Sequence, residues 1–218
     1  MPPPLPPETR TVGQLVAETI RFYGAHFWRS IALGIGPAGV IVLLYRVGWQ
    51  PAIAGAWVAW TVAAAGSFVG ACALAAPRPP AREELARGFA VGVVVALPGV
   101  VLAPVCYPLF GLGVPAALHE RLGVRAALRR GAELARADYV HTFGSVFALG
   151  IVVALTQGLL FTLIRGGSGQ TSYIAAFLAA VVVQPLLFIG GALLYVDQAA
   201  RAPGRGRPSP AEPGPAGP

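Results

Sequence analysis

Five long apolar blocks limit the folds that this 218-residue chain can adopt. They cover approximately residues 31–47, 51–76, 88–118, 142–164 and 172–196. A bilayer core of about 30 Å needs about 20 helical residues, so four of the blocks have the length of one transmembrane helix. Hydrophobic residues make up 56% of the chain and charged residues 11%, whereas about a quarter of a soluble domain is charged. The sequence therefore predicts an all-α integral membrane protein.

Arginine residues divide the connections between the blocks into two groups. The chain has 16 basic residues, all arginine, and most precede the first block, separate the second from the third, lie within 119–141 or follow the last block. Only Arg46 and Arg165 lie in the other two connections. Cytoplasmic connections collect basic residues, so we expect the arginine-rich segments and both termini to be cytoplasmic. This pattern predicts a multi-pass protein of the bacterial cytoplasmic (inner) membrane.

The third block, residues 88–118, must then leave the cytoplasmic side and return to it. It contains four prolines, which are too many helix breakers for one straight helix. We expect a proline-broken hairpin of two short or half-crossing helices that turns near Pro104 to Pro108. The alternative, one kinked span, would place the five arginines of residues 119–141 outside the cell. The predicted fold is four full spans plus this hairpin, a six-helix-like bundle.

Two amphipathic segments are expected to form cytoplasmic elbow helices beside the spans. Apolar residues recur at helical spacing over residues 11–29, and Thr11 and Gln14 at its start match a capping box. The second segment, residues 121–138, alternates arginines with alanine, leucine and valine at i, i+4 spacing. Both segments therefore present one apolar and one charged face.

The whole of residues 11–198 is predicted to be a single membrane domain. Residues 1–10 read as a disordered proline-rich tail, and residues 199–218 as a disordered basic tail. Small residues recur four apart within the blocks, for example at Gly88 and Gly92. Such stripes let helices approach closely in lipid, which favours a compact bundle.

The arginines of the second amphipathic segment are the first candidates for a binding surface. They are Arg121, Arg125, Arg129, Arg130 and Arg136. A basic amphipathic helix at a membrane surface attracts anionic lipid headgroups. We therefore expect these side chains to contact headgroups or another surface partner.

Asp197 lies at the inner end of the last block, where a carboxylate is unfavourable to the helix dipole unless a cation is near. The arginines of the second amphipathic segment are expected on the same side of the membrane. We therefore predict a structural ion pair between Asp197 and Arg129 or Arg130.

The polar residues inside the blocks are few. Thr156, Gln157 and Gln184 are the intramembrane candidates, and an interhelical hydrogen bond is the more common role for such side chains than a solute path. Gln184 precedes Pro185, which lacks an N–H and so releases the carbonyl group of Val181. We expect the last helix to be kinked there.

The residues do not assemble a recognisable catalytic set. No acid, base, nucleophile or metal-ligand set converges at one depth, so we expect no enzyme activity, no metal and no cofactor. The arginine distribution suits a membrane surface better than nucleic acid. The favoured function is a non-enzymatic protein that acts through contacts with anionic lipid, an unknown membrane-protein partner or a second copy of itself. A small-solute transporter or channel is the alternative, and a lipid-modifying enzyme has least support.

Three segments resemble one family of bacterial multi-pass membrane proteins. ALRRGAELARADYVHTFG (127–144), TVGQLVAETIRFYGAHFW (11–28) and LLYVDQAAR (193–201) are similar to motifs of the glycerophosphoryl diester phosphodiesterase membrane-domain family. The third matches a closing signature at Tyr195, Asp197 and Arg201. The resemblance implies a six-helix-like membrane bundle with cytoplasmic elbows.

The chain also departs from the family pattern. Gly131 and Ala132 stand where the family often has serine and tryptophan, and Ala137 where it has glycine. Roles of those side chains do not carry over to this chain. The phosphodiesterase of active members is a separate soluble domain, so the resemblance implies the membrane domain alone and no catalysis.

Overall fold

The computed structural model describes residues 10–47, 50–97, 107–164 and 169–201. These residues form helices joined by short connections, and no strand occurs among them, so the predicted all-α class is confirmed. In chain order the helices are α1 (Val12–Ala25), α2 (Phe27–Val47), α3 (Gln50–Ala75), α4 (Arg82–Ala96), α6 (Gly113–His119), α7 (Val124–Ala137), α8 (Tyr139–Ile164) and α9 (Gly169–Arg201).

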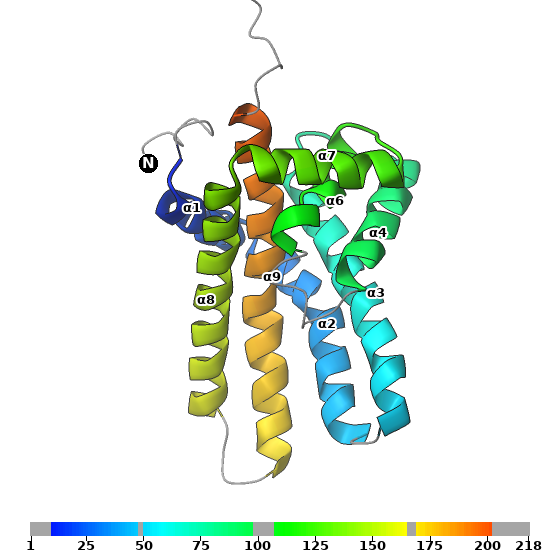
Figure 1. Cartoon of the computed structure of the whole chain (residues 1–218). Coiled ribbons are helices and arrows are strands. Elements are labelled where there is room, and N and C mark those ends of the chain that lie inside the picture. Colours follow the sequence, from blue (N-terminus) through cyan, green and yellow to red (C-terminus); the bar gives the residue numbers. More distant parts are fainter. Residues whose placement is uncertain (1–9, 48–49, 98–106, 165–168, 202–218) are drawn as a thin grey trace, which may run out of the picture.

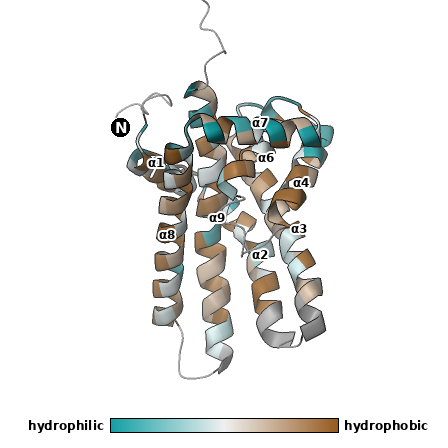
Figure 2. Cartoon of the chain, in the orientation of Figure 1, coloured by the Kyte–Doolittle hydropathy of each residue, from teal (hydrophilic) through white to brown (hydrophobic). Residues whose placement is uncertain are grey.

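Within the described ranges, three helices are long and apolar enough to cross a membrane. They are Ala54–Ala75 in α3, Tyr139–Ile164 (α8) and Thr171–Arg201 in α9. The helices Val12–Ala25 and Phe27–Leu43 meet at an angle of 100° and supply a fourth crossing if this bent pair is one span. Hydrophobic residues predominate along the long helices in Figure 2. The chain is therefore a membrane protein.

Helix α9 is the central element of the bundle and contacts α1, α2, α3 and α8 (Figure 1). It is largely buried, whereas little of α8 is buried. Pro185 lies inside α9, and it leaves the carbonyl group of Val181 without its helical N–H partner. A Cβ atom at Gly34 would collide with that carbonyl oxygen. Only glycine at this position lets α2 lie so close to α9.

The two ends of the 88–118 block lie beside each other. A Cβ atom at Gly88 would touch the side chain of Leu118, and the Arg87 guanidinium donates a hydrogen bond to the Arg121 carbonyl at 3.2 Å. Helices α4 and α6 pack together. The described ends of this block therefore lie at the same end of the bundle, which agrees with the hairpin prediction. Most of the expected turn falls within residues 98–106, outside the described residues.

The first amphipathic helix is shorter than predicted. Its capping box is confirmed, because the Thr11 N–H donates to the Gln14 side chain at 2.8 Å and the Gln14 N–H donates to the Thr11 hydroxyl at 3.4 Å. The predicted range of 11–29 was wrong at its end. His26, with φ −118° and ψ 34°, is not helical, so the chain bends there and α2 begins four residues before the predicted span.

The last helix is longer than predicted. α9 continues to Arg201, so the expected start of a disordered tail at residue 199 was wrong. The Arg201 side chain holds this end of α9, because it donates to Asp138 and Asp197 at 3.1 Å each. The other residues predicted to form tails, 1–9 and 202–218, lie outside the described residues.

Candidate functional site

Hydrophilic residues gather at one end of the bundle, which we call the polar end (Figure 2). It comprises the start of α4, helices α6 and α7, and the end of α9. Helix α7 lies across it and contacts α4, α6 and α8. A Cβ atom at Gly131 would collide with the backbone of Gly113, so α7 rests directly on α6. Arg121 lies outside α7 because its φ of 57° is in the left-handed region, and α7 begins three residues later than predicted.

Glu84 is the first of two buried carboxylates at the polar end, and its side chain is fully engaged. Arg78 donates to it at 3.1 and 3.3 Å, the Ala81 N–H donates at 2.9 Å, and Arg121 lies 2.8 Å away. The hydrogen bonds from Arg78 and then from the Ala81 backbone, with the charge of Arg121, lower the pKa of Glu84. Glu84 therefore ties the start of α4 to the connection before α7.

Asp197 is the second buried carboxylate, and its predicted partner was wrong. One oxygen, Oδ2, contacts His141 Nε2 and the Arg201 guanidinium at 3.1 Å each, and the side chain is 0% exposed. Arg129 and Arg130 contact other carboxylates. Arg201 lies one turn from Asp197 on the same helix, so it reaches the carboxylate without a contribution from α7.

Several buried polar atoms near the Asp197–His141 contact have no hydrogen-bond partner in the described part of the chain. They are Asp197 Oδ1, Thr142 Oγ1, Ser145 Oγ, Gln198 Nε2 and Arg201 Nε. Each lies within about one helical turn of that contact along α8 or α9. A buried polar atom without a partner costs about 1–3 kcal/mol. The region around Asp197 therefore has unused hydrogen-bonding capacity, which the region around Glu84 lacks.

Arg129 and Arg130, the partners predicted for Asp197, instead contact carboxylates on α7 and at the end of α6. Arg130 contacts Glu120 at 3.3 Å, and the Tyr195 hydroxyl donates to the same carboxylate oxygen at 2.8 Å. Arg129 lies 3.5 Å from Glu133 on the next turn of α7. Glu120 therefore joins α7 to α9 through side chains from both helices.

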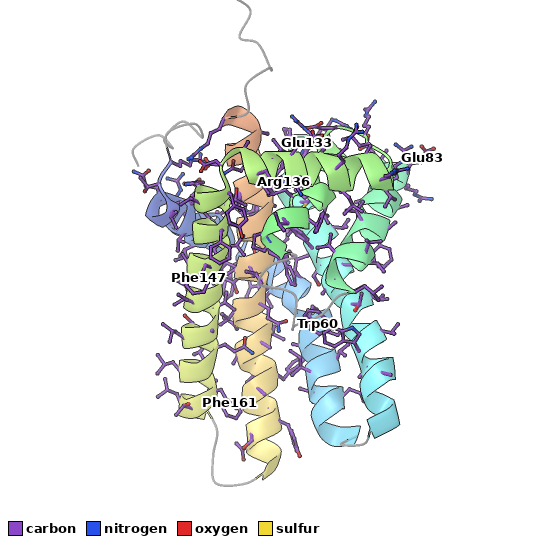
Figure 3. The ribbon with its side chains drawn as sticks, viewed as in Figure 1. Trp60, Glu83, Glu133, Arg136, Phe147 and Phe161 are labelled. Atoms are coloured by element: carbon purple, nitrogen blue, oxygen red, sulfur yellow. The ribbon has the colours of Figure 1, made fainter. Side chains whose placement is uncertain are left out.

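Three of the five candidate headgroup arginines form an exposed face of α7. Arg125, Arg129 and Arg136 are exposed. They are spaced four and then seven residues apart, so they project from one side of the helix. We call these three the basic face. Among the described carboxylates, Arg125 and Arg136 have no ion-pair partner within 4 Å. Figure 3 places Arg136 and Glu133 at the polar end. Arg121 and Arg130 instead hold the helix in place.

The intramembrane candidates divide differently. Gln157 of α8 and Gln184 of α9 line one apolar cavity of about 620 Å³ between α3, α4, α8 and α9. Thr156 precedes Gln157 on α8 and is not part of the lining. Gln184 Oε1 is buried and has no hydrogen-bond partner among the described atoms. The two amides thus share a cavity without the expected hydrogen bond at this oxygen.

Sequence reasoning missed His141 and Glu120, and it did not pair Arg201 with Asp197. The i, i+4 spacing of Asp197 and Arg201 is a signal that could have found that pair. The contact between His141 and Asp197 joins residues 56 positions apart, and nothing in the sequence indicates it. Among the described histidines, cysteines and acids, no group of three or more is placed to hold a metal ion.

Comparison of the chain with protein-family models, with curated proteins and with solved structures gives no match.

Proposed function

We propose that this chain is a membrane-embedded, non-enzymatic binding protein whose basic face contacts anionic lipid headgroups. The observation that carries the proposal is the placement of Arg125, Arg129 and Arg136 on the outer side of a helix that lies across the polar end. Two of these guanidinium groups have no carboxylate within ion-pair distance among the described residues. Their charge is available to a partner, and about 1 kcal/mol per arginine is typical at an anionic surface.

The proposal includes a topology. The described ends of the chain lie together, since the Arg201 side chain donates to the carbonyl oxygen of Arg10, and most described arginines gather at the same end. By the distribution of basic charge, this end faces the cytoplasm and the bundle sits in the bacterial inner membrane. A six-helix-like bundle of the glycerophosphoryl diester phosphodiesterase membrane-domain type remains part of the proposal.

A small-solute transporter is the second candidate, and the meeting of Gln157 and Gln184 in one cavity favours it. The other lining residues are aliphatic or aromatic, and two of them carry a polar group, the Trp60 indole N–H and the Tyr107 hydroxyl, which donates to the Leu187 carbonyl at 3.4 Å. A charged solute would lose its hydration there without meeting a counter-charge. The cavity therefore suits an apolar group better than an ion.

The test measures lipid affinity of the purified protein in mild detergent. The protein is titrated with phosphatidylglycerol and, separately, with phosphatidylcholine of the same chains, and bound lipid is counted by native mass spectrometry. We expect tighter binding of phosphatidylglycerol, weakened at high salt. Arg125→Gln with Arg136→Gln should weaken phosphatidylglycerol binding about 10- to 30-fold, as the loss of two surface arginines implies.

A matched control removes the same charge elsewhere. Arg29 and Arg82 are exposed, and Arg29→Gln with Arg82→Gln should leave the affinity within about twofold of the parent protein. Equal affinity for the two lipids, or an equal loss in both double variants, would refute the proposal. Solute flux into vesicles that disappears in Gln157→Leu with Gln184→Leu would instead favour the transporter.

A further inference from the structure

The cavity between α3, α4, α8 and α9 lies along α8, the candidate span with the smallest buried share. Its volume of about 620 Å³ is within the range of sites that hold small organic ligands. α8 contributes more lining residues than any other helix, and little of α8 is buried. In a bilayer the exposed side of α8 meets lipid, so an occupant of this cavity is most accessible from the membrane.

Stacked aromatic rings run down α8 from the polar end into the cavity. Tyr139, Phe143 and Phe147 follow one another at ring-centroid distances of 5.8 and 5.9 Å. Tyr139 is the first residue of α8, and both phenylalanines line the cavity. The rings thus form a continuous apolar surface between the headgroup level and the interior.

The cavity is long in the direction of the helix axis. Along α8 its lining extends from Phe143 to Gln157, a rise of about 21 Å. One leaflet contributes about half of a hydrocarbon core of about 30 Å. The lining is longer than this half-thickness of about 15 Å, so it accommodates a single extended chain from one leaflet. Gln157 and Gln184 are the deepest lining residues on α8 and α9, and they end the apolar surface with two amides.

The upper end of the cavity is close to the basic face. Arg136 precedes Tyr139 by three residues, and Phe143 is one turn into α8. α7 contacts both α4 and α8 (Figure 1), and the cavity has walls from these same two helices. A headgroup at Arg136 is therefore near the point where the aromatic rings enter the cavity.

We infer that the cavity holds one acyl chain of an anionic membrane lipid whose headgroup lies on the basic face. The inference rests on the proposed function and adds to it a site for the chain. The aliphatic and aromatic lining contacts the methylene groups of the chain, and the arginines of the basic face form ion pairs with the negatively charged headgroup. The amides of Gln157 and Gln184 set the depth that the chain reaches.

The test uses Trp60, which lines the cavity, as a fluorescent reporter. Trp28, Trp49 and Trp57 are changed to Phe in the full-length chain, which is purified in mild detergent and titrated with phosphatidylglycerol carrying a brominated acyl chain. Bromine quenches tryptophan at contact. We expect quenching of Trp60 to saturate at about one lipid per chain, the stoichiometry that a single cavity implies.

Two glycines of α8 provide a matched pair of variants. Neither Gly150 nor Gly158 would bring a Cβ atom within 4 Å of a neighbour, but only Gly150 lines the cavity. Gly150→Phe should reduce the quenching at least twofold, and Gly158→Phe should not change it. If Gly150→Phe lowers the melting temperature, Ala154→Phe replaces it, because Ala154 also lines the cavity. This variant should reduce the quenching in the same way.

Two results separate the inference from the proposed function. If Trp60 is quenched as strongly in the cavity variants as in Gly158→Phe, the inference is wrong. Lipid then does not enter the cavity, or residues of this chain occupy it. Binding of the headgroup to the basic face is not affected by this result. If brominated phosphatidylcholine quenches as strongly as phosphatidylglycerol and remains sensitive to Gly150→Phe, a chain enters but the anionic headgroup is not selected, which overturns the proposed function.

Discussion

Glu84 and Asp197 are both buried carboxylates at the polar end, yet their surroundings differ. Both oxygens of Glu84 accept hydrogen bonds, from Arg78 and from the Ala81 N–H. Asp197 uses one oxygen for both His141 and Arg201, and its other oxygen is without a partner among the described atoms. Arginines that are about half exposed hold Glu84, whereas the partners of Asp197 are mostly buried. Both carboxylate oxygens of Glu84 therefore have hydrogen-bond partners, whereas Asp197 depends on two buried contacts to one oxygen.

Helix α7 connects these two regions. Arg121 before its start contacts Glu84, and Asp138 after its end contacts Arg201, which also holds Asp197. The helix that carries the basic face is therefore held at both ends by ion pairs and in its middle by the approach of Gly131 to Gly113. The arginines of the basic face are therefore positioned by Arg121, Arg130 and Arg201, whose guanidinium groups contact carboxylates.

Removal of Asp197 should have the largest effect on stability. Asp197→Ala leaves His141 and Arg201 without their shared partner, and loss of one member of a buried ion pair costs about 3–5 kcal/mol. Thermal unfolding in detergent, with chemical denaturation for the free energy, measures the loss. Asp138→Ala removes a more exposed partner of Arg201 and should cost less. An equal loss in the two variants would contradict the difference in burial.

A methyl group at Gly131 should have the next largest effect. Gly131→Ala places a Cβ atom against the backbone of Gly113, which is unable to rotate away, and overpacking of this kind costs about 1–3 kcal/mol. Unfolding in detergent measures it. Gly123→Ala is the control, since its Cβ atom would meet nothing within 4 Å. Equal stability of both variants would show that α7 does not rest on α6 as described.

A double-mutant cycle tests the corrected partner of Asp197. Asp197→Asn and His141→Ala should be non-additive by about 0.5–3 kcal/mol, because the two side chains are in contact. Asp197→Asn and Arg130→Ala should add within about 0.5 kcal/mol. Coupling to Arg130 instead of His141 would restore the pairing predicted from the sequence. The free energy of unfolding of all single and double variants is the measurement.

The smallest effect is expected at Glu84, because its arginine partners are partly solvated and screened. Its pKa is lowered in the folded state, so its stabilisation is present above the ordinary glutamate pKa of about 4.3 and is lost as pH falls below that value. Glu84→Gln should remove this part of the acid sensitivity. Melting temperatures between pH 3 and 6 measure it, and identical profiles for the variant and the parent protein would contradict the assignment.

Much of the architecture followed from patterns that act locally. The length of the apolar blocks and their low charge predicted a helical membrane protein, because in the bilayer core the backbone N–H and C=O groups must hydrogen-bond within the protein, as they do in a helix. The Thr11–Gln14 capping box depends on a spacing of three residues and was found in full. The hairpin expected for residues 88–118 followed from the side preference of arginine, and the contact between Gly88 and Leu118 agrees with it.

The candidate sites were predicted less completely, since the contacts that distinguish them join distant parts of the chain. The five candidate arginines were all found in the sequence, but which of them hold α7 in place and which form the basic face was not. Glu120 and Glu84, which engage Arg130 and Arg121, lie on other elements. Gln157 and Gln184 were separate candidates, and only the packing of α8 against α9 places them in one cavity.

The sequence by itself determined the membrane class, the helical content and the end of the bundle at which charge gathers. These properties depend on composition and on spacings of a few residues, which any helix in a bilayer must satisfy. Only the tertiary structure decided that Asp197 meets His141 and Arg201, that α7 rests on α6, and that an apolar cavity opens beside α8. Those outcomes depend on which helices become neighbours, and residue spacing within one helix does not specify contacts between side chains as far apart in the chain as His141 and Asp197.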